Sequence, residues 1–352
     1  MERRSFRRVS VLADQTRQAR PPALRFLILM KDILSQLIQT PLADLQSEAF
    51  RIRKKHFGNE LSFSVPGTAA YHDSTLPTQK NRFAAISVTG GRCDLRCAHC
   101  KGKLLEAMIP AENPEVFLKI VDRLRLNGAN GILVSGGADR NGQVPLDQFI
   151  PSIKTIKEEH PVFKVIVHTG LIRRKVAEEL KEAGVDQILI DIIGNDDTIQ
   201  KVYHLNKKVK DYEDTLWMLK EMGHRVAPHI IIGHHFGEVR GEWKALELVT
   251  GVGVETIILV VFKTLDASDK DHFKVPKPDE ISKISAVARI LNPDIPIRMG
   301  CIRPAHSWKG AMERGAIDSG INTIAYPLQG TIDYAKEIGL TTKFVEMCCS
   351  LV

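Results

Sequence analysis

The chain has 352 residues, of which 43% are hydrophobic and 26% are charged, so it can bury the core of one large α/β barrel or of two smaller domains. It contains no run approaching the roughly 18 uninterrupted apolar residues that a membrane helix needs, so the sequence predicts a soluble protein without a membrane partner. The formal net charge is +7, but residues 1–29 hold seven arginines against Glu2 and Asp14, a local charge of +5, which leaves +2 for residues 30–352.

Residues 1–29 show neither helical nor strand periodicity, and they end just before a second methionine, Met30. We interpret them as a disordered extension, or as the result of a start codon assigned too far upstream. An arginine-rich targeting peptide or a nucleic-acid-binding arm is the alternative, but no aromatic or basic segment follows. The sequence therefore predicts no nucleic-acid partner.

Residues 30–80 are expected to form an N-terminal helical segment and a connector. Two amphipathic stretches over 31–58 meet at Pro41. The polar, proline-containing sequence at 61–80 is typical of a link into the next unit.

Residues 81–340 alternate short β-branched runs with amphipathic stretches, the pattern of repeated strand-helix units in a parallel sheet. Helical stretches closed by a glycine, such as PEVFLKIVDRLRLNG and YEDTLWMLKEMG, separate the runs. Eight such units predict an α/β fold, a (βα)8 TIM-type barrel whose active site lies at the C-terminal ends of the strands. The predicted strands are 83–88, 131–135, 163–168, 186–192, 226–232, 255–262, 295–299 and 322–326.

Three of the six cysteines lie within eight residues, directly after the first predicted strand. Cys93, Cys97 and Cys100 have the spacing C-x3-C-x2-C in the loop TGGRCDLRCAHC, from which three thiolates can reach three corners of a 4Fe-4S cluster and leave one iron open. A zinc site is the alternative, although structural zinc generally needs four ligands in paired groups, and no second C-x2-C is present. The lack of a disulfide framework also indicates a reducing, cytoplasmic location.

The cysteine spacing, with His99 directly before the last cysteine, resembles the signature of the radical S-adenosylmethionine (SAM) superfamily. In that family the amino and carboxylate groups of SAM chelate the open iron. One electron from the cluster breaks a carbon-sulfur bond of the sulfonium and releases a 5'-deoxyadenosyl radical, while the protein positions the groups and excludes water. The resemblance implies a 4Fe-4S cluster and SAM as cofactors.

The resemblance also assigns residues at the following strand ends to SAM binding. SGG after the second strand resembles the family's glycine motif, although Ala138 stands where relatives often have an acidic residue. The segment HIIIGHHFGE resembles the one whose backbone meets adenine. An ordinary glycine turn and isolated structural side chains are the alternatives. The predicted SAM-binding residues are Ser135, Gly136, Gly137, His168, Asp191 and Gly233, with His234 and His235 expected at the cavity mouth, one of them as a merely solvated side chain.

The sequence GAIDSGINTIAYP, at 315–327, resembles the end of the biotin synthase barrel, so the similarity spans roughly residues 31–340. Biotin synthase also needs cysteines for a sacrificial 2Fe-2S cluster on its early and middle strands. None lies between Cys100 and Cys301 in this chain, so biotin synthesis itself is disfavoured.

The remaining cysteines lie late in the chain. Cys301 follows the seventh predicted strand, and Cys348 and Cys349 lie in a predicted C-terminal tail, residues 341–352. A tail folded back over the barrel mouth would bring three thiolates together for an auxiliary iron-sulfur cluster, with Ser350 or a substrate group as the fourth ligand. The alternative is a small, buried Cys301 and a disordered tail.

This combination resembles the biotin synthase-like proteins of the two-protein lipoyl synthase of archaea and some bacteria. The motifs CDLRCAHCKGKLLEAMIPA, HTGL and PHIIIGHHFGE carry the resemblance. It implies a sulfurtransferase in lipoate biosynthesis, which abstracts hydrogen from an octanoyl chain on a lysine of an acceptor protein and lets a cluster sulfide capture the carbon radical. Arg303 is a further catalytic candidate, as a carboxylate clamp or as a residue that simply pairs within the barrel.

The implied partners are an octanoylated acceptor protein or peptide, a second radical SAM subunit, and an electron donor such as ferredoxin or flavodoxin. Two other functions stay open. One is a radical rearrangement or cofactor assembly, as in biotin synthase-like proteins of methylornithine or hydrogenase-cofactor synthesis. The other is a non-catalytic iron-sulfur or electron-transfer module.

Overall fold

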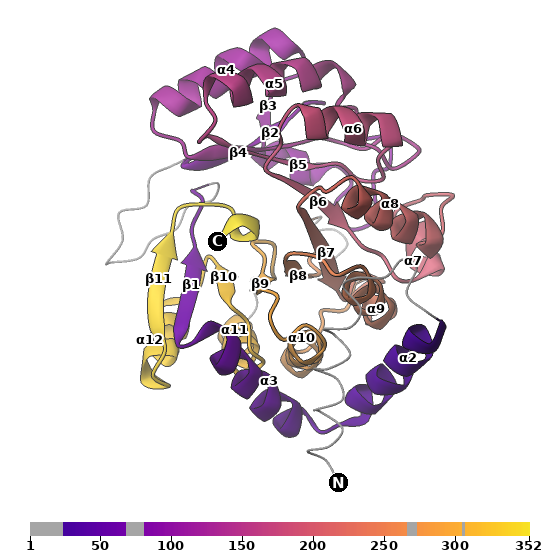
Figure 1. The fold of residues 1–352 in the computed structure, drawn as a ribbon, viewed down its shortest axis with the longest axis vertical. Coiled ribbons are helices and arrows are strands. Elements are labelled where there is room, and N and C mark those ends of the chain that lie inside the picture. Colours follow the sequence, from indigo (N-terminus) through magenta and orange to yellow (C-terminus); the bar gives the residue numbers. More distant parts are fainter. Residues whose placement is uncertain (1–23, 68–80, 266–272, 305–306) are drawn as a thin grey trace.

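A single curled parallel sheet organises the molecule. The computed structural model describes residues 24–67, 81–265, 273–304 and 307–352, with side chains from Met30 onward. Its strands are β1 (Glu60–Ser64), β2 (Phe83–Ser87), β3 (Ile109–Pro110), β4 (Gly131–Ser135), β5 (Lys164–His168), β6 (Gln187–Asp191), β7 (Val226–Ile232), β8 (Ile257–Val261), β9 (Ile297–Met299), β10 (Thr323–Ala325) and β11 (Thr341–Val345). Within the described residues they form one eleven-stranded sheet in the order β11-β1-β10-β9-β8-β7-β6-β5-β4-β2-β3, which curls around an interior (Figure 1).

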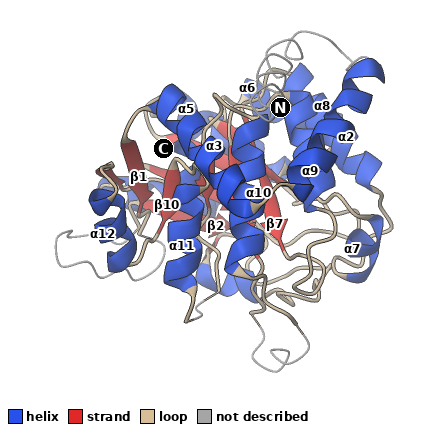
Figure 2. Cartoon of the chain, turned by 90° about the horizontal axis from the view of Figure 1, so that it is seen from below, coloured by secondary structure: helices blue, strands red, loops and turns tan. Residues whose placement is uncertain are grey.

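The helices lie outside the curl. They are α2 (Leu24–Gln39), α3 (Leu42–Phe57), α4 (Pro114–Leu126), α5 (Ile150–Glu159), α6 (Arg174–Glu182), α7 (Asp196–Lys201), α8 (Val209–Glu221), α9 (Glu242–Val252), α10 (Pro278–Leu291), α11 (Lys309–Asp318) and α12 (Gln329–Glu337). Figure 2 shows α3, α10 and α11 in front of the strands. Within the described residues, no helix is long and apolar enough to cross a membrane.

Helix α4 illustrates how the sequence specifies these elements. The side chain of Asn113 accepts a hydrogen bond from the amide of Val116 at 2.9 Å and caps the helix start. Phe117, Val121 and Leu124 recur at helical spacing and are buried. The cap therefore determines where the helix begins, and the apolar stripe determines which face of the helix packs against the core.

All eight predicted strands are present, as β2 and β4 to β10, but they do not form a closed barrel of eight. β1 pairs with β10 on one side and with β11 on the other, and β3 pairs with β2, so β2 and β10 are not neighbours. Residues 61–64, expected in a polar connector, belong to β1. Leu61 and Phe63 are fully buried and alternate with Ser62 and Ser64, whose small polar side chains concealed the strand pattern in the sequence.

Both ends of the described chain belong to the same unit as the sheet. α2 begins at Leu24, so residues 24–29 of the predicted extension are helical, while residues 1–23 lie outside the described part. The predicted C-terminal tail is not separate, because β11 pairs with β1 and the short helix η4 (Cys349–Leu351) contacts β9 and β10. In Figure 1 the C-terminus lies inside the curl.

Strand residues point alternately outward, to the helices, and inward, to the interior of the curl. On β5, Val165 and Val167 join the outer core and Ile166 joins the inner cluster. The inner cluster consists of Phe83, Ile166, Leu189, Ala227, Ile258, Val260, Ala325 and Cys349. The interior is thus apolar, and the functional groups described next stand at its C-terminal end.

Candidate active site

The cysteine loop follows β2 directly and is held by backbone hydrogen bonds from other parts of the chain. The amide of Asp94 donates to the carbonyl of Ala138, after β4, at 3.0 Å. The amide of Ala98 donates to the carbonyl of Val202, after α7, at 2.8 Å. The loop is therefore anchored at the C-terminal ends of the strands, where an active site of this architecture is expected.

The three thiols of this loop are free. Cys97 and Cys100 are buried, Cys93 is half-buried, and all three belong to one apolar cluster. Hydrogen bonds from Cys97 and His99 lower the pKa of the Cys100 thiol. Three free thiols in one anchored loop suit three corners of an iron-sulfur cluster.

The predicted glycine motif packs directly against this loop. A Cβ at Gly137 would overlap the carbonyl oxygen of Arg92 and lie 2.6 Å from the Cα of Cys93. The amide of Gly137 donates to the hydroxyl of Thr89 at 2.7 Å, and a Cβ at Gly136 would lie 3.0 Å from the same oxygen. Only glycine allows so close an approach of the two loops.

Polar side chains from neighbouring strands meet beyond the glycine motif. Nε2 of His168, on β5, lies 3.3 Å from Oδ1 of Asp191, on β6, and the hydroxyl of Ser135 donates to the carbonyl of His168 at 3.3 Å. The ring of His229, on β7, stands 5.6 Å from that of His168, measured between centroids. The structure thus brings three of the predicted residues, Ser135, His168 and Asp191, close together. It adds His229, which the sequence analysis missed because a single histidine in an apolar run gives no functional signal.

These side chains strongly influence one another's charge. Burial alone would raise the pKa of Asp191, but His168, His229 and His234 lower it below its ordinary range. Burial and His168 lower the pKa of His229 to about 4, so its imidazole is neutral at pH 7. The ligand atoms of His168, Asp191 and His229 lie within 4.8 Å of one another and could also hold a metal ion. His168 and Asp191 are two of the residues predicted to bind SAM, and His229 lies beside them.

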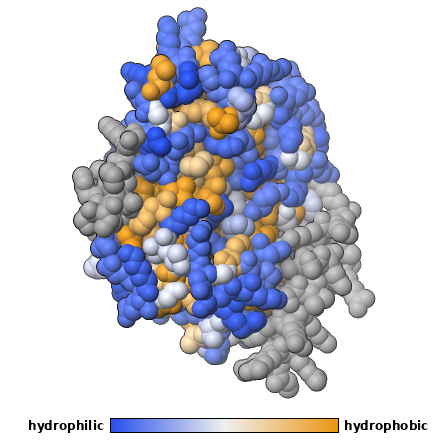
Figure 3. Space-filling model, turned by 60° about the vertical axis from the view of Figure 1, so that its left-hand side comes forward, coloured by the Kyte–Doolittle hydropathy of each residue, from blue (hydrophilic) through white to orange (hydrophobic). Residues whose placement is uncertain are grey.

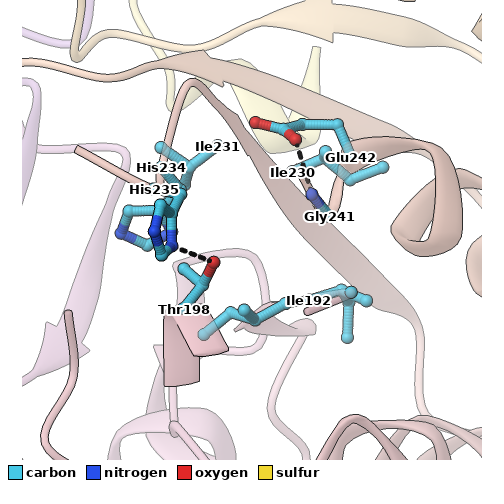
Figure 4. A pocket seen from close by; sticks show the side chains of 10 residues that line it. Ile192, Thr198, Ile230, Ile231, His234, His235, Gly241 and Glu242 are labelled. Carbon is cyan, nitrogen blue, oxygen red and sulfur yellow. Dashed lines mark hydrogen bonds between the residues drawn. The ribbon is translucent and has the colours of Figure 1, made fainter. Parts of the chain in front are cut away.

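Gly233 follows β7 in a left-handed conformation, with φ 81°, in a loop held by a buried carboxylate. Oε1 of Glu242 accepts from the amide of Gly233 at 2.6 Å, and Oε2 accepts from the amide of Gly241 at 2.9 Å (Figure 4). Burial raises the pKa of Glu242. Glu238, the acid inside the predicted motif, instead pairs with Lys274 at the surface, at 2.6 Å. Glu242 therefore supports Gly233, a role that sequence reasoning missed.

His234 and His235 are both buried, so the expectation that one of them is merely solvated is wrong. Nδ1 of His235 lies 2.9 Å from the hydroxyl of Thr198, on α7, and both histidines line a pocket next to β6 and β7 (Figure 4). Nδ1 of His234 lies 3.3 Å from the hydroxyl of Tyr203. Nε2 of His234 has no hydrogen-bond partner among the described residues.

Cys301 interacts electrostatically with Cys348 and Cys349, although it lies far from this adjacent pair in the sequence. Cys301 is exposed after β9, whereas Cys348 is half-buried and Cys349 buried at η4. Cys301 is exposed, yet the protein around its thiol raises the pKa of Cys301 by partial desolvation, and Cys348 raises this pKa further. Hydrogen bonding to Cys348, burial and the charge of Cys301 raise the pKa of Cys349. The three thiols are therefore within electrostatic reach of one another.

Two polar contacts organise this second cysteine set. Nη1 of Arg298, on β9, donates to the carbonyl of Cys349 at 2.9 Å, and the hydroxyl of Ser350 donates to Sγ of Cys348 at 3.4 Å. Hydrogen bonds from Cys349 and Ser350 lower the pKa of Cys348 to about 6. One thiol of the set is therefore ionised at neutral pH, with Ser350 beside it.

Arg303, the catalytic candidate, is used within the protein. Its Nη1 donates to the carbonyl of Gly300 at 2.6 Å. Its Nη2 donates to Oε1 of Glu313 at 2.9 Å and to the carbonyl of Tyr326 at 3.0 Å. Glu313 is fully buried, so the two form an interior ion pair with hydrogen-bonded ends. Arg303 therefore pairs within the protein, and the prediction that it clamps a carboxylate of the substrate is wrong.

Comparison with known proteins defines the class of this chain. The profile of the Radical SAM superfamily matches residues 87–249, which include the cysteine loop and the strand ends described above. Biotin synthase from Staphylococcus aureus (strain JH9) is 27% identical over 150 residues, which are 41% of this chain and 38% of that protein. The match therefore spans well under half the length of these curated relatives.

Two solved structures are similar over most of the chain. The crystal structure of methylornithine synthase (PylB) has a TM-score of 0.61 at 14% identity and covers 94% of this chain and 97% of that one. The crystal structure of HydG, a maturase of the FeFe-hydrogenase, has a TM-score of 0.62 at 16% identity, with 91% and 71% covered. At these identities the likeness shows the fold alone.

The cysteine loop and the matched profile place residues 87–249 in the Radical SAM superfamily. The curated relatives that match part of the chain are biotin synthases. The cofactors of the chain are a 4Fe-4S cluster and SAM, and the site suits both. It offers three free thiols, a glycine cradle, and buried ring nitrogens of His99 and His234 that have no hydrogen-bond partner in the described part of the chain.

Proposed function

We propose that this chain is a radical SAM enzyme that inserts sulfur into a protein-bound octanoyl chain, as one subunit of a lipoyl synthase. The observation that supports this most directly is the second cysteine set, Cys301, Cys348 and Cys349, of which Cys348 and Cys349 pack in the inner cluster. An enzyme that only rearranges its substrate has no need of a second group of thiols at that place.

The residues around the cysteine loop hold the cofactors. Cys93, Cys97 and Cys100 would bind the cluster, and the bound cofactors supply a 5'-deoxyadenosyl radical. The glycine motif lies against the cysteine loop, and its bare backbone would accept the amino group of the methionyl part of SAM. Asp191 is ionised and can accept hydrogen bonds from ribose hydroxyls. The buried surroundings keep water away from the reacting groups.

The second cysteine set would hold an auxiliary iron-sulfur cluster as the sulfur source. Cys348 is already poised as a thiolate, and deprotonated thiols are the form that binds iron. Ser350, which donates a hydrogen bond to Cys348, is the candidate for the fourth ligand, with a substrate group as the alternative.

The interior next to this set suits an aliphatic substrate. The partly buried side chains Ile302, Tyr326, Met347 and Leu351 pack against the inner cluster beside Cys349. Each methylene group buried there contributes about 0.8 kcal/mol, so a fatty acyl chain gains from entering. The face on the side of β1 and β11 also carries an apolar band among hydrophilic side chains (Figure 3).

The proposal includes partners: an octanoylated acceptor protein or peptide, an electron donor such as ferredoxin or flavodoxin, and a second radical SAM subunit for the other sulfur. The test is an anaerobic assay of the reconstituted chain with an octanoyl-lysine peptide, a reductant and SAM, read by mass spectrometry. A peptide with an unmodified lysine is the control.

We expect a mass gain on the octanoyl peptide that corresponds to one inserted sulfur, together with 5'-deoxyadenosine. Production of 5'-deoxyadenosine without a thiolated peptide, with and without the second subunit, would contradict the lipoyl assignment and favour rearrangement or cofactor assembly. Absence of 5'-deoxyadenosine under all conditions would indicate a non-catalytic module.

A further inference from the structure

Tyr203 lies between the SAM site and the cysteine loop, although no sequence motif marks it. It follows α7 and is only 8% exposed, within the apolar cluster that holds Cys97 and Cys100. The carbonyl of the preceding residue, Val202, accepts the hydrogen bond from Ala98 in the loop. The segment after α7 therefore forms one wall of the cysteine loop.

The hydroxyl of Tyr203 is shared by two groups. It lies 3.5 Å from Oδ2 of Asp191, to which it donates, and 3.3 Å from Nδ1 of His234. Asp191 has no proton to give, since its neighbours hold its pKa below the ordinary range, so the phenolic hydrogen points to this carboxylate. The phenolic oxygen is left as an acceptor, and His234 must carry its own hydrogen on Nδ1.

His234 consequently presents an unprotonated Nε2. Burial lowers the pKa of His234 well below its usual value, so the ring is neutral. Nε2 is buried without a hydrogen-bond partner in the described part of the chain, and the ring centroid stands 5.0 Å from that of His99 and 6.4 Å from that of Phe262. A lone pair left unpaired in such surroundings is costly unless a ligand supplies a donor.

We propose that Tyr203 is a positioning residue that orients His234 through the chain Asp191–Tyr203–His234, and that Nε2 of His234 accepts a hydrogen bond from the adenosyl group of SAM. The donors on that group are its amino group and its ribose hydroxyls. The inference rests on the radical SAM part of the proposed function and is independent of the octanoyl substrate.

The test measures the Kd of SAM by its effect on the electron paramagnetic resonance signal of the reduced, reconstituted full chain. Tyr203→Phe removes only the hydroxyl, and the Kd should rise about ten-fold, as for the loss of one buried hydrogen bond. Tyr212→Phe is the matched control, because Tyr212 is buried in the same apolar cluster and no described hydrogen bond joins it to Asp191 or His234. Its Kd should change less than about two-fold.

Variants of His234 test the connection itself. His234→Phe should weaken SAM binding by a similar factor, and Tyr203→Phe added to it should cause no further loss, because Tyr203 acts through His234. His234→Gln, whose carbonyl can replace Nε2 as an acceptor, should keep the Kd within about three-fold. This variant gives an answer even if Tyr203→Phe fails to retain its iron.

An unchanged Kd in Tyr203→Phe, losses that multiply in the double variant, or a His234→Gln variant as weak as His234→Phe would each overturn the inference. In those cases a normal cluster signal and normal SAM binding in the unmodified chain leave the proposed function standing. An unmodified chain that binds no SAM would overturn both.

Discussion

The first cysteine set is carried by one loop, whereas the second is assembled by tertiary structure. Cys93, Cys97 and Cys100 lie within eight residues, and the loop needs only to be pinned against neighbouring strand ends. Cys301 follows β9, and its two partners arrive with η4 after the last strand. A set of cysteines close in sequence can therefore be recognised from its spacing, while a set of the second kind depends on the whole sheet.

The two sets also differ in their surroundings. Cys97 and Cys100 are buried in an apolar cluster, whereas Cys301 is exposed. A protected set suits a cofactor that must survive many turnovers. A set with an exposed thiol suits a group that meets the substrate.

The largest effect should follow from Cys100→Ala, which removes one of the three thiolates of the first set. We expect the 4Fe-4S absorption to disappear and 5'-deoxyadenosine formation to fall by roughly 100-fold or more. Cys301→Ala, in the second set, is the control and should retain SAM cleavage. Equal SAM cleavage in the two variants would contradict the proposal that only the first cysteine set is needed for SAM cleavage.

Next in size are the changes at the second set. Cys301→Ala, Cys348→Ala and Cys349→Ala should each lower the iron content from about eight to about four atoms per chain, because one of two cubanes is lost. SAM cleavage should survive in all three, whereas thiolated product should not form. Iron analysis that finds no change in any of the three would eliminate the auxiliary cluster.

A smaller effect is expected from a substitution in the glycine motif, which packs against the cysteine loop but supplies no thiol. Gly137→Ala forces a Cβ into the backbone of Arg92 and Cys93, and should destabilise the chain by about 2 kcal/mol and reduce its iron. Gly91→Ala, two residues before Cys93, is the matched control because a Cβ there meets no atom within 4 Å. Thermal unfolding and iron analysis of both variants test the difference, which should be absent if the glycine motif does not support the loop.

The last effect concerns pH. The pKa of His229 is about 4 in the folded chain, against an ordinary value of 6.5. Between these values the unfolded chain takes up a proton that the folded chain refuses, so the contribution of His229 to stability is complete above pH 6.5 and is lost as the pH falls toward 4.

His229→Gln should therefore flatten the dependence of the unfolding free energy on pH between about 4 and 6.5, by up to about 1.4 kcal/mol per pH unit. Denaturant unfolding at several pH values measures this slope. His160→Gln is a control, because His160 lies at the end of α5, away from Asp191. An identical slope in His229→Gln and the unmodified chain would contradict a buried, neutral His229.

Much of the fold follows from local patterns in the sequence. β2 and β4 to β10 are apolar, β-branched runs, which are visible because the strands are covered on both faces. β1 was missed because Ser62 and Ser64 break its apolar run, and β11 because it is a mostly half-exposed edge strand, TTKFV. Both strands depend on partners distant in the chain, which no local pattern reveals.

The candidate site divides in the same way. The cysteine loop and the glycine motif have spacing or composition that stands out, and both lie where they were expected. Tyr203, His229 and Glu242 are single residues whose roles exist only because the fold places them against Asp191 or Gly233. Arg303 is the opposite case. Its position directly after β9 suggested a role in catalysis, but its side chain forms an interior ion pair with Glu313.

The position of β1 between β10 and β11 has a consequence for biogenesis. The last strand of the sheet can dock only on a strand made from the first part of the chain, and the segment with Cys348 and Cys349 follows that strand. During translation the cysteine loop is complete long before β11 emerges from the ribosome. The cysteine loop of a nascent chain can therefore form early, whereas the second cysteine set must wait until the first and last parts of the polypeptide have met.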